Sequence, residues 1–282
     1  INYPKLRFGK KYIDIFPYWI GFLILCVLFG LVGAFIVLRD GLQVTGLSNR
    51  VPWGMWISVD LSSISLGGSA FAFGVIVYLL KIKRFEVVGK LAVLLGFLGY
   101  STAGMVLLFD LGQPLRFWHP IVFWQVHSLL WEITMCVVLY LTVLMAELIP
   151  IIVELPFFEK HPLHEKYPIV KKIVEFSKSL SHWLHKAGPG LAVIGLSLSL
   201  LHQAALGATY SVLYGRGIWF NQSAPTQFVF SAMSGGTALL FFMSVFVFRV
   251  MRPGLVKDEV LYDVARIAGG ITLLLTYLRL WD

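Results

Sequence analysis

Seven long apolar blocks constrain this chain more than any other feature of its sequence. They fall at about residues 16–38, 56–80, 88–109, 128–152, 188–213, 226–249 and 264–281. Each block is close to the roughly 20 residues that an α-helix needs to cross the hydrocarbon core of a bilayer. Alternating segments of about ten residues, which are typical of membrane β-barrels, are not found in the sequence. The blocks therefore predict an all-α, polytopic transmembrane protein with about seven spans.

The composition supports a membrane protein. Of the 282 residues, 58% are hydrophobic and 13% are charged, whereas about a quarter of the residues of a soluble domain are charged. The two cysteines, Cys26 and Cys136, both lie inside expected spans. Two thiols are too few for an iron–sulfur cluster, which usually takes four, and their separation argues against a structural disulfide. No small-residue cleavage site follows the first apolar block, so we expect no signal peptide.

The net charge of +8 is distributed as a topology signal. Eighteen Lys and Arg residues lie on the N-terminal segment and on every second connection after it, and five lie on the other connections. Cytoplasmic loops of membrane proteins carry the excess of Lys and Arg. The N-terminus is therefore expected in the cytoplasm and the end of the seventh span outside. The charge also favours contact with anionic lipid, and it does not indicate nucleic-acid binding.

One carboxylate stands out because it lies inside an expected span. Asp60 follows Pro52-Trp53-Gly54 and precedes a stretch rich in Ser and Gly. A charged group at membrane depth is costly, so it normally faces the protein interior or a wet cavity and has a partner. The small residues after Asp60 are typical of close helix packing. Trp53 and Trp56 are typical of an interfacial aromatic belt.

Further polar groups are expected in the same outer half of the membrane. His127 and Glu132 open the fourth span, and His202-Gln203 lie about 14 residues into the fifth, roughly 20 Å from its cytoplasmic end at 1.5 Å per residue. Asp110 and Arg116 bracket a Gly- and Pro-containing turn at the outer edge, where we expect them to form an ion pair.

This cluster is compatible with quinone chemistry. Histidine can hydrogen-bond to a quinone carbonyl, and a desolvated carboxyl group is suited to the proton exchange that accompanies quinone reduction or oxidation. Aromatic residues such as Trp56 could line an apolar cleft for the ring. Two other functions remain open: a proton- or ion-coupled transporter with Asp60 and Glu132 as relay acids, and a haem b membrane anchor that uses His127 and His202.

One long connection, residues 154–187, is expected on the cytoplasmic side. After Pro168 it has apolar residues at helical spacing and basic residues between them, a pattern typical of a helix in the membrane interface. Its four histidines, His161, His164, His182 and His185, are expected to be solvated, and no metal site is predicted. This connection divides the chain into a first four-helix transmembrane bundle with the quinone pocket (1–153), the connection itself (154–187) and a second, incomplete bundle (188–282).

Four motifs resemble the NrfD/polysulfide reductase membrane subunit family, most closely its HybB and DsrP branch. They are Pro-Trp-Gly-x5-Asp at 52–60, Asp-Leu-Gly-x-Pro-x-Arg-x-Trp-His at 110–119, Ser-x3-Glu-x3-Cys-Val-x2-Tyr at 128–140, and Leu-His-Gln-x2-Leu-Gly-x2-Tyr at 201–210. The resemblance implies membrane subunits without haem or iron–sulfur clusters, built from four-helix bundles. Members usually have eight to ten spans.

The resemblance also implies a function. Family members exchange electrons between a menaquinone or ubiquinone and an extracytoplasmic, ferredoxin-like iron–sulfur subunit, and they act with further redox subunits in the bacterial or archaeal cytoplasmic membrane. We therefore expect a quinone-interacting subunit of a respiratory oxidoreductase, which alone is not a complete enzyme. The expected proton-transfer residues are Asp60 and Glu132, and the expected quinone pocket or its edge consists of Asp60, His127, Trp56, His202, Gln203 and Arg116.

Overall fold

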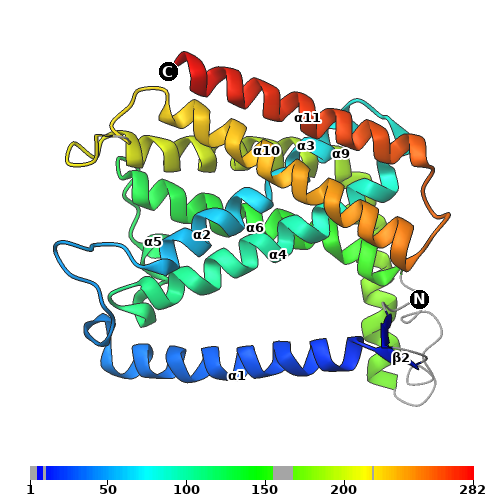
Figure 1. The fold of residues 1–282 in the computed structure, drawn as a ribbon, viewed down its shortest axis with the longest axis horizontal. Coiled ribbons are helices and arrows are strands. Elements are labelled where there is room, and N and C mark those ends of the chain that lie inside the picture. Colours follow the sequence, from blue (N-terminus) through cyan, green and yellow to red (C-terminus); the bar gives the residue numbers. More distant parts are fainter. Residues whose placement is uncertain (1–4, 9–10, 155–167, 218) are drawn as a thin grey trace.

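The computed structural model describes residues 5–8, 11–154, 168–217 and 219–282, and it is helical apart from one hairpin (Figure 1). Seven of its helical segments are long and apolar enough to cross a membrane, which confirms the number of spans expected from the sequence. They are α1 (Phe16–Asp40); α2 (Met55–Leu66) with α3 (Gly68–Gly74) and the π-helical turn η2 (Val75–Leu79); α4 (Glu86–Asp110); α6 (Leu129–Val153); α9 (Pro168–Ser211); α10 (Ala224–Val245) with the π-helical turn η5 (Phe246–Met251); and α11 (Asp258–Trp281).

Shorter elements connect these helices. They are the 3-10 turns η1 (Leu42–Val44), η3 (Lys83–Phe85) and η4 (Pro114–Arg116), and the single turn α5 (His119–Val122). We call the end of the bundle at residues 80–85 and 252–257 the basic end. The opposite end, at residues 41–54, 111–128, 212–217 and 219–223, is the motif end.

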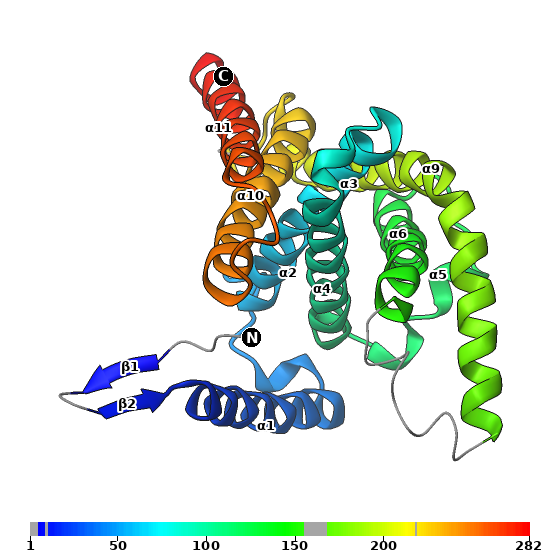
Figure 2. The same ribbon diagram turned by 90° about the vertical axis from the view of Figure 1, so that its right-hand side faces the viewer.

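A β-hairpin precedes the first span, where the sequence predicted only a basic lead. Strand β1 (Lys5–Phe8) pairs antiparallel with β2 (Lys11–Asp14), with Lys5 opposite Asp14. Polar and apolar residues alternate in β1, which is the period of a strand. The hairpin projects away from the bundle (Figure 2).

Four spans pack tightly around a common core. The span made by α2 and α3 packs against α4, α4 against α6, and α6 against α9. Tyr100, Tyr140 and Leu144 lie at the centre of this core and are almost completely buried. Small residues permit the close approach: a Cβ added to Gly99 of α4 would lie 2.5 Å from the Ser63 carbonyl oxygen of α2. This supports the packing role that the sequence predicted for the Ser and Gly residues.

Two further helices pack beside these four, and α1 lies apart. Helix α10 contacts α3, α9 and α11, and a second core cluster joins α3, α10 and α11 through Phe73, Leu240 and Val264. Helix α1 runs alongside the bundle but has few contacts with it (Figures 1 and 2). The division of the chain at residues 153 and 188 remains a proposal. Helix α6 ends at the first of these positions and α9 crosses the second, and the two helices pack closely together.

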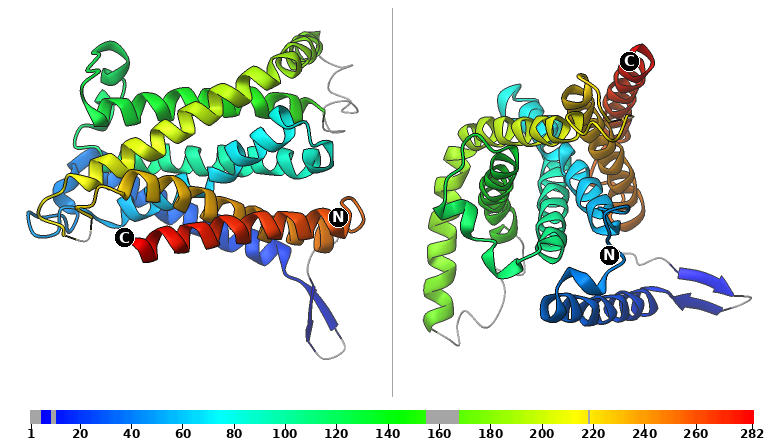
Figure 3. Two further views of the ribbon diagram at one scale, coloured as in Figure 1. Left: turned by 90° about the horizontal axis from the view of Figure 1, so that it is seen from above. Right: turned by 90° about the vertical axis from the view of Figure 1, so that its left-hand side faces the viewer.

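The basic segment after Pro168 is continuous with the fifth span. Helix α9 contains 44 residues, and its first part runs across the direction of the other spans before the chain turns to join them (Figures 1 and 3). Pro189 lies within this helix, where it lacks the N–H that an intrahelical hydrogen bond needs. The helix that the sequence predicted after Pro168 is thus present, and its location in the membrane interface stays a prediction.

Ion pairs join the elements at the basic end. Glu154, which caps α6, accepts hydrogen bonds from Lys90 of α4 (3.0 Å) and His185 of α9 (2.7 Å). Partial burial opposes ionisation of Glu154, but the bonds from Lys90 and His185 outweigh it and hold its pKa below the ordinary value. Arg84 pairs with Asp263 of α11 at 2.8 Å.

Candidate functional site

Asp60 lies in the second turn of α2, where the helix enters the bundle from the motif end. Its side chain is buried, with 7% of the residue exposed. No cation and no hydrogen-bond donor contacts Asp60 among the residues that the structure describes. The acid therefore sits at membrane depth without a counter-ion, which is unusual outside functional sites.

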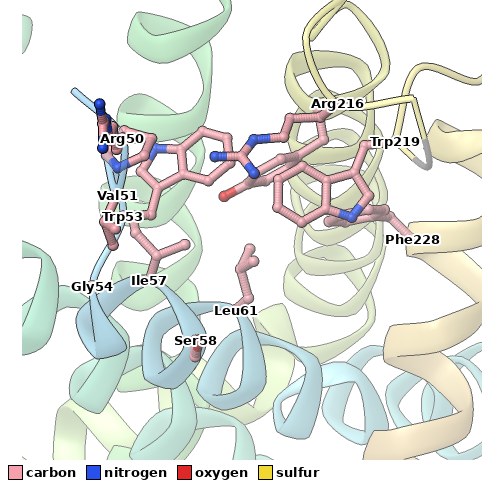
Figure 4. Close-up of a pocket in the computed structure, with 12 residues that line it drawn as sticks. Arg50, Val51, Trp53, Gly54, Ile57, Ser58, Leu61, Arg216, Trp219 and Phe228 are labelled. Carbon is pink, nitrogen blue, oxygen red and sulfur yellow. The ribbon is translucent and has the colours of Figure 1, made fainter. Parts of the chain in front are cut away.

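A cavity of about 480 Å³ opens at the motif end beside the start of α2. Its floor is formed by α2, and its walls come from the chain before α2, the end of α9 and the start of α10 (Figure 4). The lining residues are Arg50, Val51, Pro52, Trp53, Gly54, Ile57, Ser58, Leu61, Tyr210, Arg216, Trp219 and Phe228. We call it the Trp53 cavity.

Four aromatic rings line the Trp53 cavity. The ring centroids of Trp53 and Trp219 are 5.2 Å apart, and Tyr210 stacks on Phe228 at 5.6 Å. The guanidinium of Arg216 lies 6.0 Å from the centroid of the Trp53 ring. Such a box offers flat apolar faces to a planar ring together with N–H donors at its mouth.

The Trp53 cavity is positively charged. Arg50 and Arg216 both line it, and neither forms an ion pair with a carboxylate in the described part of the chain. Their guanidinium groups are therefore available to hydrogen-bond to a carbonyl oxygen or an anion in the cavity.

Helix α2 connects this cavity to the buried acid. Ser58 and Leu61 line the cavity, and Asp60 lies between them in the sequence of α2. Tyr210 lines the cavity as well, and a phenol can donate and accept a hydrogen bond. The cavity therefore borders the helix turn that carries Asp60.

His202 and Gln203 lie deeper, in a polar cluster within the core. The Tyr100 hydroxyl and His202 Nδ1 are 3.1 Å apart, and the Tyr100 ring packs against Tyr140 with centroids 4.6 Å apart. Three buried polar atoms of α9 have no protein partner in the described part of the chain: Ser199 Oγ, His202 Nε2 and Gln203 Nε2. Buried polar groups are normally hydrogen-bonded, so internal water is expected here.

The structure separates the other predicted site residues from this cluster. His127 is exposed on the connection that precedes α6, and Glu132 is half-buried in the first turn of α6. The Trp56 ring packs against Phe109 of α4, with centroids 6.1 Å apart. Arg116 is exposed in the turn η4. The expected ion pair between Asp110 and Arg116 is wrong, because the structure forms none between these two described residues.

Several functional candidates were not singled out from the sequence. Tyr210 ends a quoted motif, and Arg216 and Trp219 lie in an outer connection, but nothing in the spacing predicts that they meet Trp53. Tyr100 is preceded by Gly96 and Gly99, and this pair of glycines is the signal that could have marked it as a close packing position.

A comparison with known protein families now identifies the chain. The family described as "Polysulphide reductase, NrfD" matches residues 43–280. This chain belongs to the NrfD family. The family expected from the sequence is thereby confirmed.

Individual relatives of this NrfD chain are membrane subunits of redox complexes. The integral membrane subunit of menaquinone reductase from Nitratidesulfovibrio vulgaris is 36% identical over 269 residues, which cover 93% of this chain and 61% of the relative. A "probable Ni/Fe-hydrogenase 2 b-type cytochrome subunit" of Escherichia coli is 29% identical over 174 residues, or 59% of this chain and 38% of the relative.

A more distant relative comes from an archaeon. The integral membrane subunit of an Hdr-like menaquinol oxidoreductase from Archaeoglobus fulgidus is 22% identical over 242 residues, or 86% of this chain and 53% of the relative. The NrfD chain thus spans about 60% or less of the length of these curated relatives. With its seven candidate spans, it is a multi-pass integral membrane protein.

His127 and His202 are not placed as an axial pair for haem. His202 is completely buried among packed side chains and bonded to Tyr100, whereas His127 is exposed on a connection. Within the described residues, no group of three His, Cys, Asp or Glu side chains is arranged to hold a metal ion. His161 and His164 lie outside the described residues.

Proposed function

We propose that this NrfD chain is the quinone-reactive part of an integral membrane subunit in a respiratory oxidoreductase. It would exchange electrons between menaquinol, or another quinol, and an iron–sulfur subunit at the motif end. The observation that carries the proposal is the aromatic, arginine-bearing Trp53 cavity, whose floor is the part of α2 that carries the unpaired acid Asp60. The names of the N. vulgaris and A. fulgidus relatives, which refer to menaquinone and menaquinol, support the same substrate class.

Each group has a defined role in this proposal. Trp53 and Trp219, which pack against each other, would offer an aromatic surface to the quinone ring, and Arg50 and Arg216 would donate N–H bonds to a ring carbonyl oxygen. A bound quinone supplies two-electron, two-proton chemistry. Tyr210 would offer its hydroxyl to a ring oxygen, and Asp60, which lies between the cavity-lining residues Ser58 and Leu61 of α2, would act as the local acid or base.

The proposal revises the pocket expected from the sequence. It keeps Asp60 and adds Arg50, Trp53, Tyr210, Arg216 and Trp219. Glu132, half-buried in the first turn of α6, remains a candidate for proton exchange at the motif end. His202 and Gln203 would support the site from the core.

The topology expected from the charge distribution predicts on which side of the membrane the iron–sulfur subunit would dock. With the basic end in the cytoplasm of a bacterium or archaeon, the motif end and the Trp53 cavity face the outside of the cytoplasmic membrane. A ferredoxin-like iron–sulfur subunit would dock there, close to the quinone ring. Further redox subunits would complete the enzyme.

The test is the replacement Asp60→Asn in the assembled complex. Loss of the proton-transfer group should lower quinol-linked turnover about 100-fold or more, while the subunits still co-purify. The matched control is Asp40→Asn, which changes an acid at the same end of the membrane that pairs with Arg39 on the surface; its turnover should be unchanged. Retained turnover in Asp60→Asn, or ion flux through vesicles that contain no redox partner, would contradict the proposal.

A further inference from the structure

A second set of clefts lies away from the Trp53 cavity, on the side of the bundle formed by α4 and α6. The larger cleft has a volume of about 570 Å³ and runs between these two helices. Apolar side chains such as Met105, Leu108, Val138 and Leu141 form most of its wall. The Thr134 hydroxyl, which also borders the cleft, is already bonded to the Leu130 carbonyl within α6. The groove therefore suits a hydrocarbon chain.

Polar groups border this groove at its motif end. Gln113 and Arg116, in the turn after α4, form that part of the wall. The same two residues also line a neighbouring cleft of about 370 Å³, together with Leu38 of α1, Pro114 and Leu115. One cationic and one amide side chain thus lie where two clefts meet.

The charge of Arg116 has no partner in the described part of the chain. The guanidinium is exposed, and no carboxylate of the described residues pairs with it. It lies where a helix leaves the apolar layer, the depth at which lipid headgroups are found. Arginine binds phosphate oxygens in a two-pronged, charge-assisted geometry.

We propose that these clefts bind one anionic diacyl phospholipid. Its phosphate would contact Arg116 and Gln113, one acyl chain would lie in the groove between α4 and α6, and the second would extend toward Leu38. Two clefts that meet at one cation correspond to the two chains and single charged head of such a lipid. A quinone has one tail and an uncharged ring, so it would use only half of this arrangement.

The lipid would also have a structural role. Helix α1 has few contacts with the rest of the bundle (Figure 2), and Leu38 lies near its C-terminal end. A lipid that spans the two clefts would fill space between α1 and α4. The site shares no lining residue with the Trp53 cavity, so this inference does not depend on the proposed function.

The test uses the purified complex in nanodiscs that contain phosphatidylcholine and a small fraction of phosphatidylglycerol with a photoreactive acyl chain. Cross-linked peptides should map to α4 and α6, and excess phosphatidylglycerol should compete while phosphatidylcholine should not. Arg116→Gln should reduce cross-linking roughly tenfold, which corresponds to the loss of one charge-assisted contact.

Two more variants keep the test decisive. Gly104→Leu should also reduce cross-linking while Arg116 stays intact, because Gly104 lines the groove and an added Cβ there meets no atom within 4 Å. Arg252→Gln, an exposed arginine at the basic end, should leave labelling unchanged. The proposal is overturned if labelling maps elsewhere, if phosphatidylcholine competes equally, if Arg116→Gln and Gly104→Leu both label normally, or if mass spectrometry finds a quinone in these clefts.

Discussion

At the scale of single residues, the contact between Tyr100 and His202 is one in which the loss of either side chain would leave the other buried without this hydrogen-bond partner. Both side chains are fully buried, and the contact joins a phenol of α4 to an imidazole of α9 inside the apolar core. A hydrogen bond of this kind contributes only about 1 kcal/mol net, but an orphaned buried partner costs more. The pair therefore holds α9 in one position relative to α4.

We predict that Tyr100→Phe destabilises the protein by roughly 1–3 kcal/mol, because it leaves His202 Nδ1 buried without a partner. Thermal unfolding in detergent measures the change. The control is Tyr262→Phe, at a tyrosine that is 62% exposed, where an effect within about 0.5 kcal/mol is expected.

A double variant sharpens this prediction. Tyr100→Phe combined with His202→Leu should cost clearly less than the sum of the two single changes, since neither polar group is then orphaned. Additive costs would show that the two side chains are not coupled.

At the scale of elements, backbone proximity decides how the spans cross. Gly99 of α4 lies against the backbone of Ser63 in α2, and Gly68 lies against the Ala232 carbonyl of α10. Both contacts involve main-chain atoms, which cannot rotate away as a side chain can. These crossings set the position of α2 and therefore the place of Asp60 relative to α4 and α9.

We predict that Gly99→Ala destabilises the protein by roughly 1–3 kcal/mol, because its Cβ would lie 2.5 Å from the Ser63 carbonyl oxygen. The control is Gly269→Ala on α11, where an added Cβ meets no atom within 4 Å. There the change should be neutral or stabilising by up to about 1 kcal/mol, since alanine favours helices over glycine. Thermal unfolding of both variants measures the difference, and equal behaviour would argue against the tight crossing.

At the scale of the whole molecule, charge and architecture agree on two distinct ends. The basic end carries Lys90, Glu154, His185 and the pair of Arg84 with Asp263, while the motif end carries the Trp53 cavity. Membrane insertion retains Lys- and Arg-rich connections in the cytoplasm. The two ends therefore should face different compartments.

We predict that Gly215→Cys, at the motif end, reacts with a membrane-impermeant maleimide in intact cells that express the chain alone. Leu255→Cys, at the basic end, should react only after the cells are permeabilised. Both residues are exposed, and Cys26 and Cys136 are replaced by alanine in the background. The opposite labelling pattern would reverse the assigned orientation.

The sequence predicted much of the fold because hydrophobic length is a one-dimensional property. A block of about twenty apolar residues can satisfy its backbone in lipid only as a helix, so the seven spans follow without knowledge of packing. The N-terminal hairpin was missed because its strands have only four residues each, too short for a clear signal. Asp60 was found for a similar reason: an acid in an apolar block is conspicuous in the sequence alone.

The sequence by itself thus determined that this is a polytopic membrane protein, which family it belongs to and that it carries an acid within a span. The tertiary structure decided which residues contact one another. The Trp53 cavity joins residues more than 150 positions apart, and Tyr100 reaches His202 across two helices. Helical periodicity tells which face a residue occupies but not which helix faces it. That choice depends on how small residues let particular helices approach, which is why Asp60 lies on the helix that forms the floor of the Trp53 cavity, while His127 and Arg116 lie in other surroundings.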